Sequence, residues 1–227
     1  LEDISSINAD GIICLGDIIG YGAEPTLCIE EMKKGIIKCI KGNHEGAISG
    51  ELDLSYFNEE ARDAIQWTQH QLTHSDLQFI SQLKRKMSVT NNILGVHGSP
   101  RQPLWEYIIN EQTAEEIFTR FDFWVYFIGH SHIAGYFTYS HQDKDICYFP
   151  ATLGARVELG QKNSYIINCG SVGQPRDGNP QASFGIFDTE RNIVSIKRID
   201  YPVKEARRKI EQAHLPLFLS QRLNLGI

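Results

Sequence analysis

Two short apolar runs that end in glycine flank an amphipathic segment near the start of the chain. The runs are Asp10–Gly16 and Gly35–Gly42, and both are rich in residues that favour strands. Between them, Glu24–Lys34 carries apolar residues at near-helical spacing, with a proline near its start and lysines at its end. This pattern predicts a strand–helix–strand unit with parallel strands and a right-handed crossover.

Further helices and strands are predicted along the rest of the chain. Asn58–Gln71 reads as a helix capped by Asn58, and Ser75–Lys84 opens with a capping-box pattern of Ser75 and Gln78. Apolar runs predict strands at 91–98, 123–130, 135–140 and 145–150, and a last helix at 203–213. Closely spaced runs at 164–170, 182–188 and 192–199 predict an antiparallel meander. With no repeat or linker in view, the chain is expected to form one layered α/β domain over residues 1–227.

Composition and charge narrow the class of protein. The 227 residues are 41% hydrophobic and 22% charged, as in an ordinary globular domain. The formal charge of −6 argues against a non-specific nucleic-acid binder, and no specific nucleic-acid partner is expected. The apolar stretch Phe121–Gly129 is far shorter than the roughly 20 residues that a bilayer requires, so no membrane association is expected.

The cysteines indicate a cellular compartment. The chain has five, an odd number, and none forms a C-x-x-C pair. Most of them lie in apolar runs, which predicts buried free thiols in a reducing cytoplasm. The oligomeric state is left open by the sequence.

Polar residues able to bind metal follow four of the apolar runs. They are Asp17 in "GDIIGYG", Asn43 and His44 in "GNHE", His97 in "GVHGSP", and His130 and His132 in "GHSH". A single histidine at such a place is more often structural, but four clusters at strand ends favour a common site, because loops converge at the carboxyl edge of an α/β sheet. Oxygen and imidazole ligands without thiolate suit Mn, Fe, Ni, Co or Zn.

These four motifs, in this order, resemble the calcineurin-like metallophosphoesterase superfamily. The longer stretches "GDIIGYGAEP", "HGSPRQPLWEYI" and "NCGSVGQPRDGNPQASFGIFD" are similar to its small bacterial and archaeal phosphodiesterase branch, over about Gly11 to Asp188. The resemblance implies a sandwich of two mixed β-sheets flanked by helices. It also implies hydrolysis of a small phosphate ester by a water or hydroxide held on two divalent metal ions, with manganese as the first choice.

The resemblance further implies a role for each motif residue. Asp17 would bridge the two metals, Asn43, His97 and His130 would complete one metal site, and His132 would belong to the other. His44 would lie beside the substrate phosphate as electrostatic stabiliser or general acid.

Other residues near the motifs have two interpretations each. Arg101 and Arg176 could grip phosphate through a two-pronged guanidinium contact, although surface arginines are common. Glu45 could orient the ring of His44 or simply begin a helix. Tyr21 and Trp105 could wall the pocket or pack in the core.

One family motif is absent. The family begins with a strand that ends in Asp-x-His and supplies ligands to the second metal, and no Asp-x-His precedes Asp17 here. We expect that the chain is an N-terminal truncation that lacks this first strand; the alternative is a natural variant with a mononuclear or degenerate site. The expected function is that of a metal-dependent phosphoesterase, most simply a phosphodiesterase, and the alternative is a catalytically degenerate binding or scaffold protein on the same fold.

Overall fold

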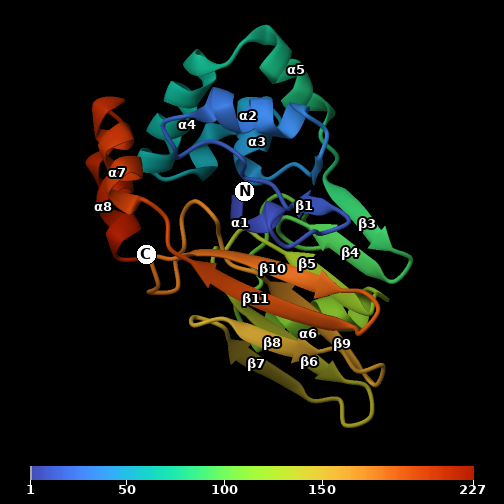
Figure 1. The fold of residues 1–227 in the computed structure, drawn as a ribbon. Helices are drawn as coiled ribbons and strands as arrows, with labels where there is room; N and C mark the ends of the chain where they lie inside the picture. The colour runs from blue at the N-terminus through green and yellow to red at the C-terminus, as the bar shows by residue number, and fades with distance from the viewer. Residues whose placement is uncertain (1) are drawn as a thin grey trace.

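The computed structural model describes residues 2–227, and the strands in this part of the chain form three sheets (Figure 1). The six-stranded sheet has the order β3 (Lys86–Thr90), β4 (Ile93–Val96), β5 (Val125–Ile128), β9 (Asn163–Asn168), β6 (Gly135–Ser140) and β7 (Ile146–Pro150). The three-stranded sheet has the order β10 (Ala182–Asp188), β11 (Ile193–Ile199) and β8 (Ala155–Glu158). The third sheet pairs β1 (Ile12–Cys14) with β2 (Ile37–Cys39) in parallel.

The six-stranded sheet is mixed, with β4, β5 and β9 parallel at its centre and β3, β6 and β7 antiparallel to their neighbours. The predicted meander of three consecutive strands is therefore wrong. Strand β9 lies between β5 and β6, whereas in the other sheet β10 pairs with β11 and β11 pairs with β8. The physical reason is burial: residues 164–168 are buried on both faces, which suits a central strand rather than the member of a half-exposed meander.

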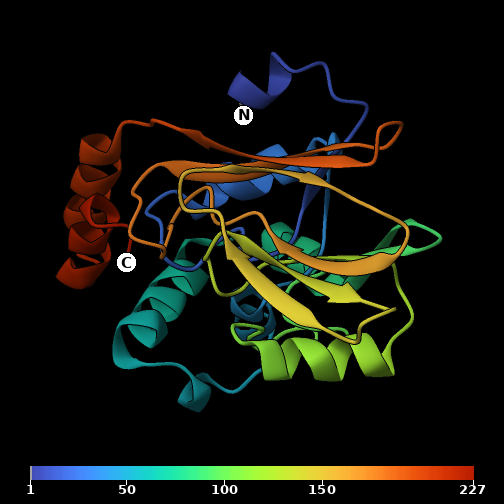
Figure 2. The same ribbon diagram turned by 90° about the horizontal axis from the view of Figure 1, so that it is seen from below.

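The two larger sheets pack as a sandwich with a helix outside. Helix α6 (Glu111–Arg120) covers one face of the six-stranded sheet, and the three-stranded sheet covers the other (Figure 2). Successive residues of β9 show the alternation: Ile166 packs with the α6 cluster and Ile167 with residues of β8 and β11. The structure confirms the predicted layered α/β sandwich flanked by helices. Only the six-stranded sheet of the sandwich is mixed, because the pairs of the three-stranded sheet are both antiparallel.

The remaining helices cover the edge and the top of the sandwich in the view of Figure 1. Helix α2 joins β1 to β2, as the strand–helix–strand pattern predicts. The helices are α1 (Glu2–Ser5), α2 (Pro25–Lys33), α3 (Asn43–Ile48), α4 (Glu59–Gln71), α5 (His74–Gln82), α7 (Val203–Gln212) and α8 (Leu217–Gln221), with 3-10 turns η1 (Leu54–Tyr56) and η2 (Arg222–Asn224).

Helix caps match the prediction for α4 and correct it for α5. The Asn58 side chain accepts a hydrogen bond from the Ala61 amide at 2.9 Å, as predicted. Helix α5 is capped by Thr73 rather than Ser75: the Thr73 hydroxyl accepts from the Asp76 amide, and the Asp76 carboxylate accepts from the Thr73 amide at 2.8 Å. An acid at the third helical position completes the capping box in place of the expected glutamine.

The cysteines are all free thiols, but the prediction that they are buried is wrong. Cys28 is exposed and the other four are partly exposed. Cys14 and Cys39 pair with each other in the sheet of β1 and β2, which has only two strands and does not bury them completely. Among the described residues, no helix is both long and apolar enough to cross a bilayer.

Candidate metal centre

Five of the predicted site residues lie where parallel strands end. Asp17 follows β1 and Asn43 begins α3 just after β2, while His97 follows β4 and both His130 and His132 follow β5. Because the strands within each of these pairs run in the same direction, their carboxyl ends present their loops at one edge. The structure brings these loops into contact.

Four side chains meet at one point. Nε2 of His97 lies 3.0 Å from Oδ1 of Asn43, 3.1 Å from Nδ1 of His130 and 3.3 Å from Oδ2 of Asp17. The ligand atoms of Asp17, His97 and His130 all lie within 4.8 Å of one another. This spacing lets a single cation contact them with small adjustments.

His132 approaches the same carboxylate. Its Nε2 lies 3.9 Å from Oδ2 of Asp17, the oxygen that also faces His97. Asp17 is thus shared between His132 and the four-residue cluster. This is the arrangement that a carboxylate bridging two cations would require.

Backbone carbonyls fix the orientation of all three histidine rings. Nδ1 of His97 lies 2.8 Å from the Leu15 carbonyl, Nε2 of His130 lies 3.1 Å from the Trp105 carbonyl, and Nδ1 of His132 lies 2.7 Å from the Gln174 carbonyl. A carbonyl only accepts, so in a neutral ring each of these nitrogens carries the proton. The other nitrogen of each ring then presents its lone pair to the cluster, as in outer-shell support of metal-ligating histidines.

The atoms that face one another in the cluster suit a bound cation. The side-chain oxygen of Asn43 faces the ring nitrogens of His97 and His130 and the carboxylate of Asp17, all of which are acceptors in these protonation states. Turning the amide over would let its nitrogen donate to the same atoms at 3.0–3.1 Å. A cation at the centre satisfies all four groups without that rotation, so the residues present suit a divalent metal with oxygen and imidazole ligands.

The charges of the cluster agree with ligand chemistry. Burial would raise the pKa of Asp17, but the neighbouring imidazoles of His97, His44 and His132 lower it well below its usual value. Burial would lower the pKa of His97, and the charge of Asp17 raises it above its usual value. Burial lowers the pKa of His130 to about 3, with the charge of His97 adding to the effect, and it lowers the pKa of His132 as well. The carboxylate is therefore ionised and these two imidazoles are neutral at neutral pH, which are the forms that bind metal.

Three of these residues have left-handed backbone conformations. The φ angles are +54° at Asp17, +62° at His130 and +59° at His132. Such angles are uncommon for residues other than glycine and cluster at functional sites. They turn each side chain inward immediately after its strand.

Glu45 holds the Asp17 loop in place, and sequence reasoning missed this role. Its carboxylate accepts hydrogen bonds from the backbone amides of Asp17 and Ile18 at 2.8 Å each and from that of Gly42 at 2.9 Å. No contact to the His44 ring is found for it among the described residues, so the interpretation that Glu45 orients His44 is wrong. The capping-box position of Glu45 was hidden because the capping residue, Gly42, lacks a hydroxyl.

Burial sets the electrostatics of Glu45. Desolvation and the negative charge of Asp17 together raise its pKa to about 7, against the opposing effect of the backbone amides of Gly42 and Asp17. A cation on Asp17 would cancel that neighbouring charge and favour the carboxylate form.

His44 lies beside the cluster in an aromatic cage. Its ring centroid is 4.3 Å from that of Tyr21 and 5.6 Å from that of Phe57. Its Nδ1 is buried without a hydrogen-bond partner among the described residues, and a methyl group at Gly20 would lie 2.1 Å from that atom. Burial lowers the pKa of His44 to about 4, so the imidazole is neutral at neutral pH.

The two predicted phosphate-binding arginines differ in their surroundings. Arg101 is paired with Glu106 and Glu116, so its guanidinium is occupied within the protein. The backbone amide of Arg176, in contrast, donates to the His132 carbonyl at 3.1 Å, which keeps this residue next to the cluster. Of these two arginines, Arg176 is therefore the one whose backbone is bound directly to the cluster.

The aromatic side chains of Tyr21 and Trp105 border the site as well as the core. Tyr21 contacts His44, and the ring centroid of Trp105 lies 6.0 Å from that of His130. Both rings also pack against the buried cluster of α3 and α4. Each ring therefore contacts the site and also packs in the core, so the two interpretations do not exclude each other.

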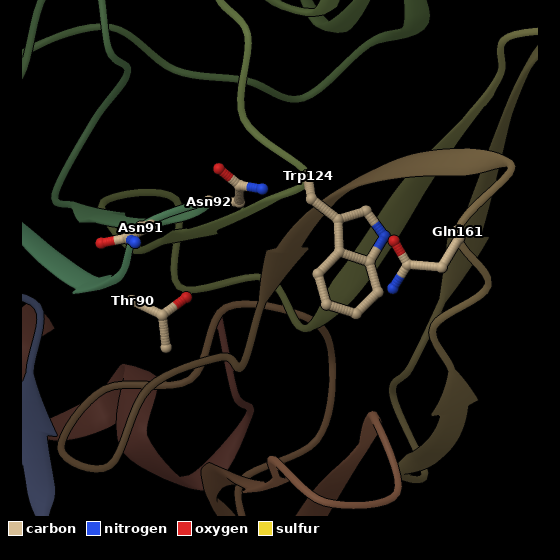
Figure 3. Close-up of a pocket in the computed structure, with 5 residues that line it drawn as sticks. All are labelled: Thr90, Asn91, Asn92, Trp124 and Gln161. Carbon is tan, nitrogen blue, oxygen red and sulfur yellow. The ribbon is translucent and has the colours of Figure 1, made fainter.

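A hollow on the surface lies at the opposite end of β4 and β5 from the cluster. It is a shallow depression of ≈ 480 Å³ at the starts of β4 and β5, lined by Thr90, Asn91, Asn92, Trp124 and Gln161 (Figure 3). None of these side chains is charged or suited to acid–base catalysis at neutral pH. The chemistry-bearing residues are at the other end, and we place the functional site there.

Comparison with known proteins agrees with this geometry. Residues 1–192 match the family model described as the calcineurin-like phosphoesterase superfamily domain. The uncharacterized protein MJ0912 of Methanocaldococcus jannaschii is 35% identical over 232 residues, which cover 100% of this chain and 90% of that protein.

Two solved structures share the fold. A metallophosphoesterase from Sphaerobacter thermophilus superposes with a TM-score of 0.85 at 35% identity, covering 99% of this chain and 91% of that one. A hypothetical protein, PH1004, from Pyrococcus horikoshii superposes with a TM-score of 0.76 at 18% identity, covering 100% and 90%, which speaks for the fold alone. By its sequence match and its structural relatives, the chain belongs to the calcineurin-like phosphoesterase superfamily.

Proposed function

We propose that this protein hydrolyses a small phosphodiester in a reaction that depends on divalent metal. The observation that carries the proposal is the convergence of Asp17, Asn43, His97 and His130, with lone pairs that all face one point. A structural cluster of buried polar groups would pair donors with acceptors. Here acceptors face acceptors, which favours a cation site.

These residues would divide into two metal-binding sets. Asn43, His97 and His130 would hold one ion and His132 part of a second, with Asp17 shared between them. A divalent cation supplies positive charge to hold phosphoryl oxygens and lowers the pKa of water. Manganese is our first choice, with Fe, Ni, Co and Zn compatible with the same ligands.

His44 would contact the substrate phosphate rather than a metal. Its ring is fixed between Tyr21 and Phe57, and it is neutral at neutral pH. A neutral imidazole N–H can donate a hydrogen bond to a phosphoryl oxygen or to the leaving oxygen. Proton donation to the leaving group would need the pKa of His44 to rise, which a bound phosphate anion would cause.

The substrate is proposed to be a small phosphate ester, with no nucleic-acid or membrane partner. Arg176 supplies positive charge next to His132, while the chain as a whole carries a formal charge of −6. A duplex would meet repulsion over most of the surface, whereas a small anion meets only the local charge.

The test is hydrolysis of bis(p-nitrophenyl) phosphate by the purified full-length protein with and without Mn²⁺. We expect His130→Ala to lower bound metal and activity together. His44→Ala should leave metal content unchanged and lower activity, by about 10²–10⁴-fold for esters with basic leaving groups and by less for this activated aryl ester. The exposed His74→Ala is the control and should change neither. Metal bound normally, but no turnover of any activated phosphate ester, would instead support a catalytically degenerate binding protein.

A further inference from the structure

Two arginines near the metal cluster have no aspartate or glutamate partner among the described residues. Arg176 donates from Nε and a terminal nitrogen to Oε1 of Gln174, at 3.2 and 2.8 Å. Arg222 donates from Nε to a backbone oxygen of Ile227, and its guanidinium carbon lies 5.0 Å from the ring centroid of Phe218. Within the described residues neither arginine forms an ion pair, and the terminal nitrogens of Arg222 have no hydrogen-bond partner. Guanidinium groups carry five donors, so both retain capacity for an anion.

Arg176 is fixed close to His44 and His132. Its guanidinium carbon lies 5.6 Å from the ring centroid of Tyr21, which in turn lies 4.3 Å from that of His44. The bonds between its own amide and the His132 carbonyl, and between His132 and the Gln174 carbonyl, join this loop to the cluster.

The element that carries Arg222 lies against the loop of Arg176. The Gly226 carbonyl accepts a hydrogen bond at 2.8 Å from the amide of Gly178, two residues beyond Arg176, so the last turn is held against the Arg176 loop. Tyr21 packs against the buried cluster formed by α7, α8 and η2, and Arg222 is the first residue of η2. Tyr21 thus lies between His44, Arg176 and the element that carries Arg222.

The two positive charges are within electrostatic reach of each other. Burial lowers the pKa of Arg222 and the charge of Arg176 lowers it further, while Tyr21, Glu60 and Tyr107 act in the opposite direction. Repulsion between two partly desolvated guanidinium groups is relieved when an anion binds both. In a chain with a formal charge of −6, this concentration of positive charge is local.

We propose that Arg176 and Arg222 form a second anion site, which binds a phosphate group of the substrate other than the one that is hydrolysed. The proposal rests on the proposed function and narrows its substrate class to phosphate esters that carry a second phosphate. Free inorganic phosphate has the same chemistry, so the experiment must separate the two sources.

The first measurement is calorimetric binding of inorganic phosphate to the full-length protein after removal of metal with a chelator. Arg222→Gln and Arg176→Gln are each expected to weaken binding about ten- to hundredfold, the effect of losing a charge-assisted contact. Arg222→Lys should recover part of the affinity, and the exposed Arg208→Gln should leave it unchanged. Circular dichroism checks that the variants fold. Unaltered affinity in the folded Arg222→Gln protein would overturn the proposal.

The second measurement compares the p-nitrophenyl ester of thymidine 5′-phosphate with the same ester carrying a 3′-phosphate. Arg222→Gln is expected to lower kcat/KM about tenfold or more for the bisphosphate and less than about twofold for the monophosphate. Equal losses on both substrates, or no preference of the wild type for the bisphosphate, would overturn the assignment to substrate. If the wild type hydrolyses neither ester, the proposed function fails, while the calorimetry still decides whether the anion site exists.

Discussion

Gly42 offers a direct way to disturb the candidate metal centre without touching a ligand. A β-carbon at this position would lie 2.2 Å from Oδ1 of Asp17 and 2.5 Å from its backbone nitrogen. The φ and ψ of Gly42 are −96° and −176°, an extended conformation that alanine adopts freely. Any effect of Gly42→Ala therefore comes from the collision with Asp17 and not from backbone strain.

The size of the effect follows from the contact distances. Carbon and oxygen atoms pack at roughly 3.5 Å, so the Asp17 carboxylate must move by about 1 Å. Metal sites tolerate ligand displacements of about 0.2 Å. We expect metal affinity to fall at least about 100-fold, and the free energy of unfolding to fall by about 1–3 kcal/mol from overpacking.

The assay is metal content after dialysis against a series of metal-buffered solutions, together with urea unfolding of the same samples. Gly22→Ala is the matched control, because a β-carbon there meets nothing within 4 Å. If Gly42→Ala is destabilised as the collision with Asp17 requires, yet binds metal as tightly as the wild type, Asp17 has moved without loss of metal. The assignment of Asp17 as a ligand would then be wrong.

Two further predictions concern neighbouring contacts. Gly20→Ala places a methyl group 2.1 Å from Nδ1 of His44 at a φ of +115°. It should lower turnover about 100-fold while metal content stays normal, whereas loss of a metal ligand would lower both. A parallel loss of metal would contradict this prediction. Asp177→Ala removes the ion-pair partner of Arg198, whose side chain is only 4% exposed. It should lower the free energy of unfolding, measured in urea, by about 3–5 kcal/mol. A loss below about 1 kcal/mol would show that the buried charge of Arg198 finds another partner.

The clustering of Asp17, Asn43, His97 and His130 could be predicted from sequence because each of these residues follows an apolar run of its own. Strand identity and direction are local properties, and they are enough to place Asp17 and His97 at one sheet edge. The role of Glu45 could not be read in this way, since its acceptor oxygens serve amides of a loop 26–28 residues earlier. That contact exists only once β1 and β2 have paired.

Tertiary packing also decides the strand order. The runs 164–170 and 182–188 follow each other along the chain, yet β9 pairs with β5 and β6 instead. Burial of β9 on both faces was only partly visible in the sequence, because its apolar stretch Tyr165–Ile167 lies between the buried polar residues Ser164 and Asn168. No local sequence pattern indicates a role for Arg222, because its position depends on the hydrogen-bonded turn that holds η2 against the Arg176 loop.

The left-handed backbone at Asp17, His130 and His132 bears on how the protein can be engineered. Each such residue costs the native fold about 1–2 kcal/mol relative to an ordinary conformation. A library screened only for thermal stability would therefore enrich asparagine or glycine at these three positions and discard the metal site along the way. At these three positions, selection for stability opposes selection for activity. Stabilising substitutions should therefore be sought at sites outside these turns.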